Sequence, residues 1–169
     1  AELMRDLNLN TVCKEANCPN LGECYRKHTS TFMILGSICT RNCRFCNVTT
    51  GHPLPPAPEE PMNVAKAAKK LGLRHVVLTC STRDDLPDGG AEQFAKCVRA
   101  IRELCLGITV ETLISDMKMN TDALDIVIAA HPEVLNHNVE TVKELQAAVR
   151  PQARYERSLN VLRYCKEKA

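Results

Sequence analysis

After Pro61 the apolar residues recur at helical spacing, and each helical stretch is followed by a short run rich in β-branched residues. Three such steps appear along the chain, and two more helices are indicated near its end. The predicted helices carry apolar faces at 64–71, 94–105 and 124–128, the predicted strands cover 75–79, 108–114 and 133–138, and the last two helices cover 139–149 and 155–168. Regular alternation of this kind predicts a mainly parallel sheet with helices packed outside it.

Before Pro61 the pattern is less regular. The run from Thr31 to Ile38 predicts a buried strand, and residues 52–61 contain five of the nine prolines, which indicates an extended loop. Residues 1–31 show little periodicity beyond a short helix after Pro19, so something other than a core is expected to order them. We therefore divide the chain into an N-terminal extension, residues 1–31, and an α/β domain, residues 32–169.

The four predicted strands are too few for a closed barrel, because an eight-stranded (β/α) barrel typically needs about 250 residues. The chain has 169 residues and ends on Lys-Glu-Lys-Ala, directly after a predicted helix. The fold class we expect is an α/β partial barrel of parallel strands with outer helices, preceded by a cysteine-rich extension, and with the C-terminal strands missing by truncation.

Composition excludes several classes of protein. With 44% hydrophobic and 25% charged residues, disorder is not expected, and no apolar run approaches the roughly 18 residues of a membrane span. The 22 basic and 20 acidic residues are interspersed, so the sequence shows no broad basic region that would attract nucleic acid. The start of the chain does not resemble a secretory signal. We expect a soluble, cytoplasmic protein that binds neither membrane nor nucleic acid.

The chain contains ten cysteines, and six of them fall between Cys13 and Cys46. A reducing compartment keeps thiols available for metals, so this clustering favours metal ligation or redox chemistry over disulfides. The tighter triplet follows the predicted strand and reads Cys39-Thr-Arg-Asn-Cys43-Arg-Phe-Cys46. Three thiolates on one loop suit three corners of a [4Fe-4S] cluster and leave one iron open to a small molecule. A zinc site is the alternative, although zinc sites usually show paired C-x2-C units.

The other triplet, Cys13-x4-Cys18-x5-Cys24, is looser and is compatible with zinc or with a second cluster. His28 and His52 are the nearest extra donors, but a single histidine more often serves a structural role. Outside the two triplets the cysteines stand singly, and packing is their expected role, with Cys80 at a strand end the least certain.

The sequence resembles the radical S-adenosylmethionine (SAM) enzymes through the triplet at 39–46, and the preceding triplet at 13–24 is similar to that of the lipoyl synthase family in particular. The likeness runs from about Leu9 to Lys166. Further matching stretches are 31–36, 73–79, 83–90, 135–141 and 154–159.

The resemblance implies two [4Fe-4S] clusters and SAM as cofactors. Cys39, Cys43 and Cys46 would hold the cluster that binds SAM, and an auxiliary cluster would be held by the other triplet. The metal ligands expected in the extension are Cys13, Cys18 and Cys24. Polar side chains at strand ends are expected to contact SAM, and these are Thr79, Ser81, Glu111, Asn136, Asn138 and Glu140. For Glu111 a structural salt bridge is a comparable alternative.

The implied reaction inserts two sulfur atoms at C6 and C8 of an octanoyl group on a lipoyl carrier domain or protein. A 5′-deoxyadenosyl radical would abstract the hydrogen atoms, and the auxiliary cluster would supply the sulfurs. Reduced ferredoxin or flavodoxin is the expected electron donor. Arg41 and Arg44 are expected either to soften the charge of the cluster, to meet that donor, or to be solvated surface arginines. The residues Asp84, Asp85, Asp88, Gly89 and Gly90 are expected to form a turn before a helix, with capping and a tight bend as their role.

Some positions depart from the family pattern. Cys80-Ser81 stands where Ser-Val is common, Ser115 and Met119 replace a usual Pro and Gly, and no late Arg-Ser-Ser-Ser motif is present to complete the auxiliary cluster. Three alternatives therefore stay open: a non-catalytic iron-sulfur or zinc-binding module, an inactive fragment, and another SAM-radical sulfur-insertion enzyme.

Overall fold

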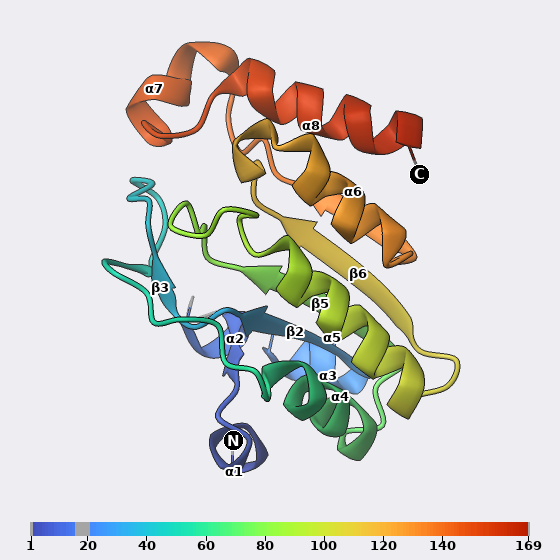
Figure 1. The fold of residues 1–169 in the computed structure, drawn as a ribbon. Coiled ribbons are helices and arrows are strands. Elements are labelled where there is room, and N and C mark those ends of the chain that lie inside the picture. Colours follow the sequence, from blue (N-terminus) through green and yellow to red (C-terminus); the bar gives the residue numbers. More distant parts are fainter. Residues whose placement is uncertain (1, 16–20, 169) are drawn as a thin grey trace.

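The computed structural model describes residues 2–15 and 21–168, and its centre is a five-stranded sheet in the order β1-β2-β5-β6-β7 (Figure 1). The strands β2, β5, β6 and β7 are parallel to their neighbours, and only β1 runs antiparallel, at the edge beside β2. The strands of this sheet are β1 (Asn10–Thr11), β2 (Thr29–Ile34), β5 (His75–Cys80), β6 (Thr109–Ile114) and β7 (Val134–His137). The predicted parallel α/β architecture is confirmed.

Helices follow the strands in the predicted alternation. The longer ones are α4 (Glu60–Lys70), α5 (Ala91–Leu104), α6 (Thr121–Ala129) and α8 (Tyr155–Lys168). The shorter elements are α1 (Glu2–Asp6), α2 (Val12–Glu15), α3 (Leu21–Arg26), β3 (Ile38–Cys39), β4 (Thr49–Thr50), the 3-10 turns η1 (Met117–Met119) and η2 (Lys143–Leu145), and α7 (Gln146–Val149). None of the helices in the described part of the chain is long and apolar enough to cross a membrane.

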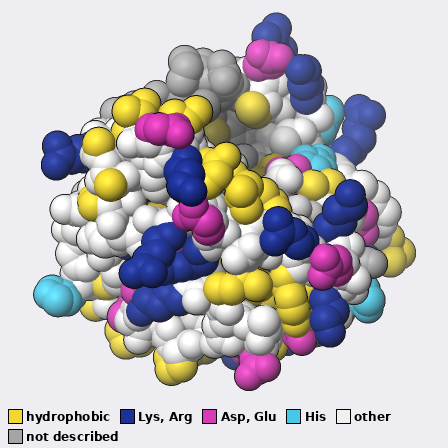
Figure 2. All heavy atoms as spheres, turned by 90° about the horizontal axis from the view of Figure 1, so that it is seen from above, with side chains coloured by type: hydrophobic (Ala, Val, Ile, Leu, Met, Phe, Trp, Pro, Cys, Tyr) yellow, Lys and Arg dark blue, Asp and Glu magenta, His cyan; other side chains and the backbone are white. Residues whose placement is uncertain are grey.

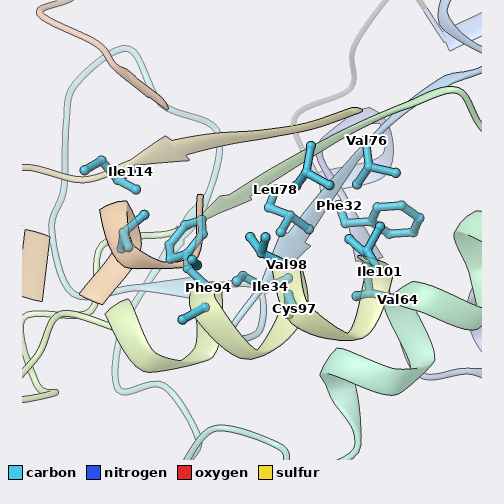
Figure 3. Packing of buried hydrophobic residues seen from close by; sticks show 14 of the residues in the cluster. Phe32, Ile34, Val64, Val76, Leu78, Phe94, Cys97, Val98, Ile101 and Ile114 are labelled. Atoms are coloured by element: carbon cyan, nitrogen blue, oxygen red, sulfur yellow. The ribbon is translucent and has the colours of Figure 1, made fainter. Parts of the chain in front are cut away.

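The hydrophobic core lies between one face of the sheet and the helices α4, α5 and α6, which lie side by side along it (Figure 1). Alternate strand residues such as Phe32, Val76 and Leu78 point into this layer and meet Phe94 and Ile101 of α5 (Figure 3). The period of two in the strands and the 3.6-residue period in the helices thus converge on one apolar layer. This layer holds the strands in register and so fixes where each strand ends.

The opposite face of the sheet is more polar. The parallel register places Thr31, Val77 and Glu111 side by side across β2, β5 and β6, and all three are half-buried. On the exterior, side chains of both charge signs are interspersed, as Figure 2 shows from the side of α7 and α8.

Two predicted elements differ from the structure. The strand from Thr31 to Ile38 ends at Ile34, because Leu35 and Gly36 adopt positive φ angles of 67° and 85° and turn the chain. The helix predicted for 139–149 is wrong over its first half, where Glu140 has a φ of 70° and only η2 and α7 are helical. A left-handed residue cannot continue a right-handed helix.

The extension is also more closely tied to the core than its sequence indicates. Leu9 and Thr11 are buried, and Leu3, Met4 and Leu7 pack against the core cluster. The backbone of β1 pairs with Phe32 and Met33. The expectation that something other than a core must order residues 1–31 is therefore wrong for their first part.

Candidate functional site

The tighter cysteine triplet lies on a loop at the carboxyl edge of the sheet. Strand β2 ends at Ile34, and after the turn at Gly36 the short strand β3 pairs in parallel with β4, in the register Ile38 to Thr49. The backbone N–H of Gly51 donates to the carbonyl of Cys39 at 3.0 Å, which closes the base of the loop. The carboxyl edge of a parallel sheet is where such folds place their chemistry.

The three thiols of this loop differ in exposure, and two of them accept backbone N–H groups. Cys39 and Cys43 are half-buried, and Cys46 is exposed. The backbone N–H of Arg41 donates to Sγ of Cys39 at 3.4 Å, and that of Val48 donates to Sγ of Cys46 at 3.5 Å. N–H groups directed at sulfur stabilise the negative charge of cluster-ligating thiolates. Soft sulfur donors on one loop therefore suit an iron-sulfur cluster by their chemistry.

The structure does not bring these thiols together as a preformed metal site. Within residues 2–15 and 21–168 no three Cys, His, Asp or Glu side chains are arranged to hold a metal ion.

Of the looser triplet, Cys13 lies in α2 and Cys24 in α3, and both are half-buried. Cys18 lies outside the described residues. The strand β1 ends directly before α2 and pairs with β2, so this arm starts at the edge of the same sheet that carries the tighter loop.

Arg41, in the middle of the tighter loop, is not solvated, and the expectation of a surface arginine is wrong for this residue. Arg41 is 4% exposed, and its side chain forms two hydrogen bonds each with Asp84 and Asp116. Burial alone would lower the pKa of the guanidinium, but these carboxylates outweigh it and raise the pKa. Burial likewise acts to raise the pKa of Asp116, yet the hydrogen bonds from Arg41 keep it below its usual value. Arg44, by contrast, is exposed, as expected of a solvated arginine.

The polar residues predicted for SAM are partly engaged with the protein itself. The hydroxyl of Thr79 donates to the carbonyl of Leu113 at 3.0 Å, and that of Ser81 donates to the carbonyl of Ile38 at 2.7 Å. Each hydroxyl thus keeps its acceptor lone pairs at the carboxyl edge. Asn138 and Glu140 are exposed after the end of β7.

Glu111 and Asn136 lie together on the polar face of the sheet. The amide Nδ2 of Asn136 donates to Oε1 of Glu111 at 2.7 Å, and Nε2 of His75 lies 3.1 Å from the other carboxylate oxygen. Glu111 therefore has a structural partner in the protein, the imidazole of His75, in line with the alternative that the sequence leaves open; the contact is an ion pair only when His75 is protonated. The oxygen Oδ1 of Asn136 stays available as an acceptor.

Several residues near the loop were missed by sequence reasoning. Phe45 stands between Cys43 and Cys46 with 55% of its surface exposed, so its ring faces solvent beside two of the thiols. An aromatic residue inside a polar cysteine loop is a signal that sequence reasoning can use.

Gln146, at the start of α7, is buried with neither of its amide atoms hydrogen-bonded. The loop touches α7 through the bond from Arg44 N–H to the carbonyl of Val149 at 2.9 Å.

A second network of buried polar groups supports the base of the loop. Both carboxylate oxygens of Glu60 accept the backbone N–H of Leu35 at 3.0 Å, and Gln93 donates to the same carboxylate. Arg83, which is 1% exposed, donates to the carbonyls of Leu35 and Leu54. These bonds hold the turn after β2 to the proline-rich loop.

A pocket of about 280 Å³ lies next to this network. Its walls come from Asn10 of β1, from the turn at Gly36 and Ile38, and from Leu54 of the proline-rich loop. It therefore lies between the N-terminal arm and the cysteine loop.

Comparison with known proteins relates this fold and site to a family. Residues 33–169 match the model of the radical SAM superfamily. The chain is 57% identical over 164 residues to the lipoyl synthase of Caldanaerobacter subterraneus subsp. tengcongensis, which covers 97% of this chain and 57% of that protein. It is 54% identical over 166 residues to the lipoyl synthase of Aquifex aeolicus, covering 98% of this chain and 60% of the relative. The chain thus spans somewhat more than half the length of the curated relatives it matches.

Among solved structures, methylornithine synthase has a similar fold, with a TM-score of 0.63 over 98% of this chain and 52% of that one, at 16% sequence identity. At this identity the likeness concerns the fold alone.

Proposed function

The chain belongs to the radical SAM superfamily, and from that premise we propose that it is the N-terminal and central part of a lipoyl synthase. The superfamily implies SAM and an iron-sulfur cluster as cofactors. The proposed reaction inserts two sulfur atoms at C6 and C8 of an octanoyl group carried on a protein. The observation that carries the proposal is the placement of the CxxxCxxC loop at the carboxyl edge of a parallel sheet, with a second cysteine arm starting at the edge of that sheet.

In this proposal each cysteine triplet holds one cluster, so the protein carries two. Cys39, Cys43 and Cys46 hold the cluster that binds SAM. The auxiliary cluster is held by Cys13, Cys18 and Cys24, which matches our division of the chain into a 1–31 arm and a 32–169 partial barrel. When bound, the first cluster and SAM supply the one-electron chemistry that unactivated C–H bonds require.

The residues around the loop provide what SAM needs in order to be oriented. The exposed ring of Phe45 offers a flat apolar face for a purine. The hydroxyls of Thr79 and Ser81 already donate to backbone carbonyls, so they present lone pairs that suit an ammonium group. Oδ1 of Asn136 and the exposed side chains of Asn138 and Glu140 add acceptors for the same ligand. Glu111 is bonded to His75 and Asn136, so its part in SAM binding is to hold Asn136 in position.

The protein partners follow from the same chemistry. An octanoylated lipoyl carrier domain would bring its acyl chain between the two cysteine sets, and reduced ferredoxin or flavodoxin would supply the electron. Unactivated carbon must be held close to a sulfur atom and away from water, so the protein's task is orientation and exclusion of solvent.

The test is product analysis under anaerobic conditions. The intact protein, reconstituted with iron and sulfide, is mixed with SAM, a reductant and an octanoylated carrier domain, and the carrier is examined by mass spectrometry. We expect a gain of two sulfur atoms with loss of two hydrogen atoms, together with 5′-deoxyadenosine.

Matched variants separate the two cysteine sets. Cys39→Ser is expected to abolish SAM cleavage, whereas Cys13→Ser is expected to retain SAM cleavage and lose sulfur insertion. Cys80→Ser, which removes a cysteine at the same edge of the sheet but outside both triplets, should retain both activities. SAM cleavage without any modified carrier in the unmutated protein would overturn the proposed substrate.

A further inference from the structure

A buried arginine in the middle of a cysteine loop needs a physical explanation. Charged side chains are rarely buried unless they are paired, because the loss of hydration costs several kcal/mol per ion. Arg41 is separated from Cys39 and Cys43 by one residue on each side, yet it is almost inaccessible to solvent. Its charge must therefore be compensated by specific partners.

Those partners come from two other loops at the same edge of the sheet. Nε and Nη2 of Arg41 donate to Asp84 at 2.7 and 2.9 Å, and Nη1 and Nη2 donate to Asp116 at 3.0 and 2.7 Å. Asp84 follows β5, and Asp116, which is completely buried, follows β6. Arg157 of α8 adds a further bond to Asp116 at 3.2 Å. The guanidinium thus joins the cysteine loop to the loops after two central strands.

The backbone around Arg41 is anchored in the same direction. The N–H and the hydroxyl of Thr40 both donate to the carbonyl of Thr82, and the N–H of Asp84 donates to the hydroxyl of Thr40. Ser81 donates to the carbonyl of Ile38, and Thr50 donates to the carbonyl of Arg41. Residues 38–41 are therefore attached to the loop after β5 at several points.

The second half of the loop is held differently. The N–H of Asn42 donates to Oε1 of Gln152 at 3.2 Å, and the N–H of Arg44 donates to the carbonyl of Val149 at 2.9 Å. Residues 44–47 are exposed. Cys43 and Cys46 thus lie on the half of the loop that is bonded to residues 149–152, whereas the half with Cys39 is bonded to the loop after β5.

We propose that Arg41 is a positioning residue that fixes the Cys39 half of the loop onto the edge of the sheet. The guanidinium acts through geometry, because all three of its nitrogen atoms already donate to the two carboxylates. A lysine at this position would keep the charge but not the fork that reaches both carboxylates. The inference deepens the proposed iron-sulfur role of the loop, but it concerns the metal-free protein and can be tested apart from that role.

The experiment is amide hydrogen exchange with mass spectrometry on the intact protein, purified without iron. In the unmutated protein, we expect slower exchange at residues 38–41 than at the exposed residues 44–46. Arg41→Ala should accelerate exchange at 38–41, 84–86 and 116–118 by at least about tenfold, since a buried carboxylate loses its main partner. Residues 94–101 of α5 serve as the internal reference and should change much less. Arg44→Ala, which removes an exposed arginine from the same loop, is the matched control and should change none of these segments.

Arg41→Lys keeps the proposal testable if Arg41→Ala does not fold. We expect an intermediate acceleration confined to the same segments, because a single ammonium group replaces part of the bonding. Equal exchange at 38–41 in Arg41→Lys and unmutated protein would overturn the proposal, and so would an acceleration that is as large in α5 as in the loop. Neither result would bear on the product test of the proposed function, so failure of one is distinguishable from failure of the other.

Discussion

Replacing Gly90 by alanine should destabilise the fold through one contact at the base of the cysteine loop. Gly90 precedes α5 with a φ of 94°, and a Cβ built there would lie 2.3 Å from Cδ1 of Leu35. Leu35 is itself buried and held in a left-handed conformation with a φ of 67°, so it has little freedom to move away. Strain at a positive φ costs about 1–2 kcal/mol, and overpacking of a filled core costs about 1–3 kcal/mol more. We therefore expect Gly90→Ala to lower the free energy of unfolding by roughly 2–5 kcal/mol.

A second glycine isolates the steric part of this loss. Gly107 has a φ of 76°, but a Cβ there would meet nothing within 4 Å. Gly107→Ala should therefore cost only the backbone strain, about 1–2 kcal/mol. The assay is equilibrium unfolding in urea, with the free energies compared at equal slopes. In a Leu35→Ala background the extra cost of Gly90→Ala should disappear. If the two glycine variants lose the same free energy of unfolding within about 0.5 kcal/mol, the usual error of additivity, then a Cβ at position 90 has no steric cost against Leu35.

Three further predictions concern a side chain beside the thiols and two buried titratable groups. Phe45→Ala should weaken SAM binding to the reconstituted protein about tenfold in calorimetry, since stacking on an aromatic ring contributes about 1–3 kcal/mol. Leu106→Ala, at a residue that is 95% exposed, should leave the affinity unchanged. Equal affinities for both variants would show that the ring of Phe45 does not contact SAM. Burial lowers the pKa of His137, whose Nδ1 donates to the carbonyl of Ile114. The unfolded chain therefore binds the proton more readily, and the free energy of unfolding should fall as the pH drops from 7 towards 5. His137→Asn should flatten this pH dependence in urea unfolding, and an unchanged pH dependence would show that His137 is not its cause. Burial raises the pKa of Glu60, so the folded state retains the proton of this carboxyl group more readily than the unfolded chain does. The free energy of unfolding should therefore decline as the pH rises from the unfolded pKa near 4.5 through the raised pKa of the folded state. Glu60→Gln should lack this decline, and a decline that persists in Glu60→Gln would have to come from another group.

The sequence predicts the central strands and their helices well, because buried parallel strands and amphipathic helices have distinct periods. The strand predicted at 75–79 is observed as β5, one residue longer, and the helix at 155–168 is observed as α8. Of the turn and cap predicted for Asp84 to Gly90, the part at 88–90 is observed, with Asp88 accepting the N–H groups of Gly90 and Glu92. These features depend on local pattern, which is present in any short window of the chain. The predicted capping role is wrong for Asp84 and Asp85, whose carboxylates instead accept from Arg41 and Arg83.

The errors arise where distant residues decide the local conformation. The helix predicted at 139–149 is interrupted at Glu140, and the side chain of Arg150 donates to the carbonyls of Asn138 and Val139. No propensity rule anticipates a left-handed glutamate. Similarly, Arg41 is buried by carboxylates 43 and 75 residues further along the chain, and that pairing depends on the tertiary fold.

The candidate site is predicted in part for the same reason. The cysteine spacing and its position after a strand are local features, so the sequence predicts where the loop lies, and the structure confirms that it follows β2 at the carboxyl edge of the sheet. Which polar side chains remain available for a ligand is decided by their partners in the fold. Glu111 illustrates this, because His75 and Asn136 occupy its carboxylate.

The central claim is that the loop at 39–46 binds a cluster with one iron open to SAM. The direct measurement is electron paramagnetic resonance of the reduced, anaerobically reconstituted protein carrying Cys13→Ser and Cys24→Ser, so that only the tighter triplet contributes a signal. We predict a cluster spectrum whose g values shift when SAM is added. A reduced cluster with an unchanged spectrum at saturating SAM would contradict it.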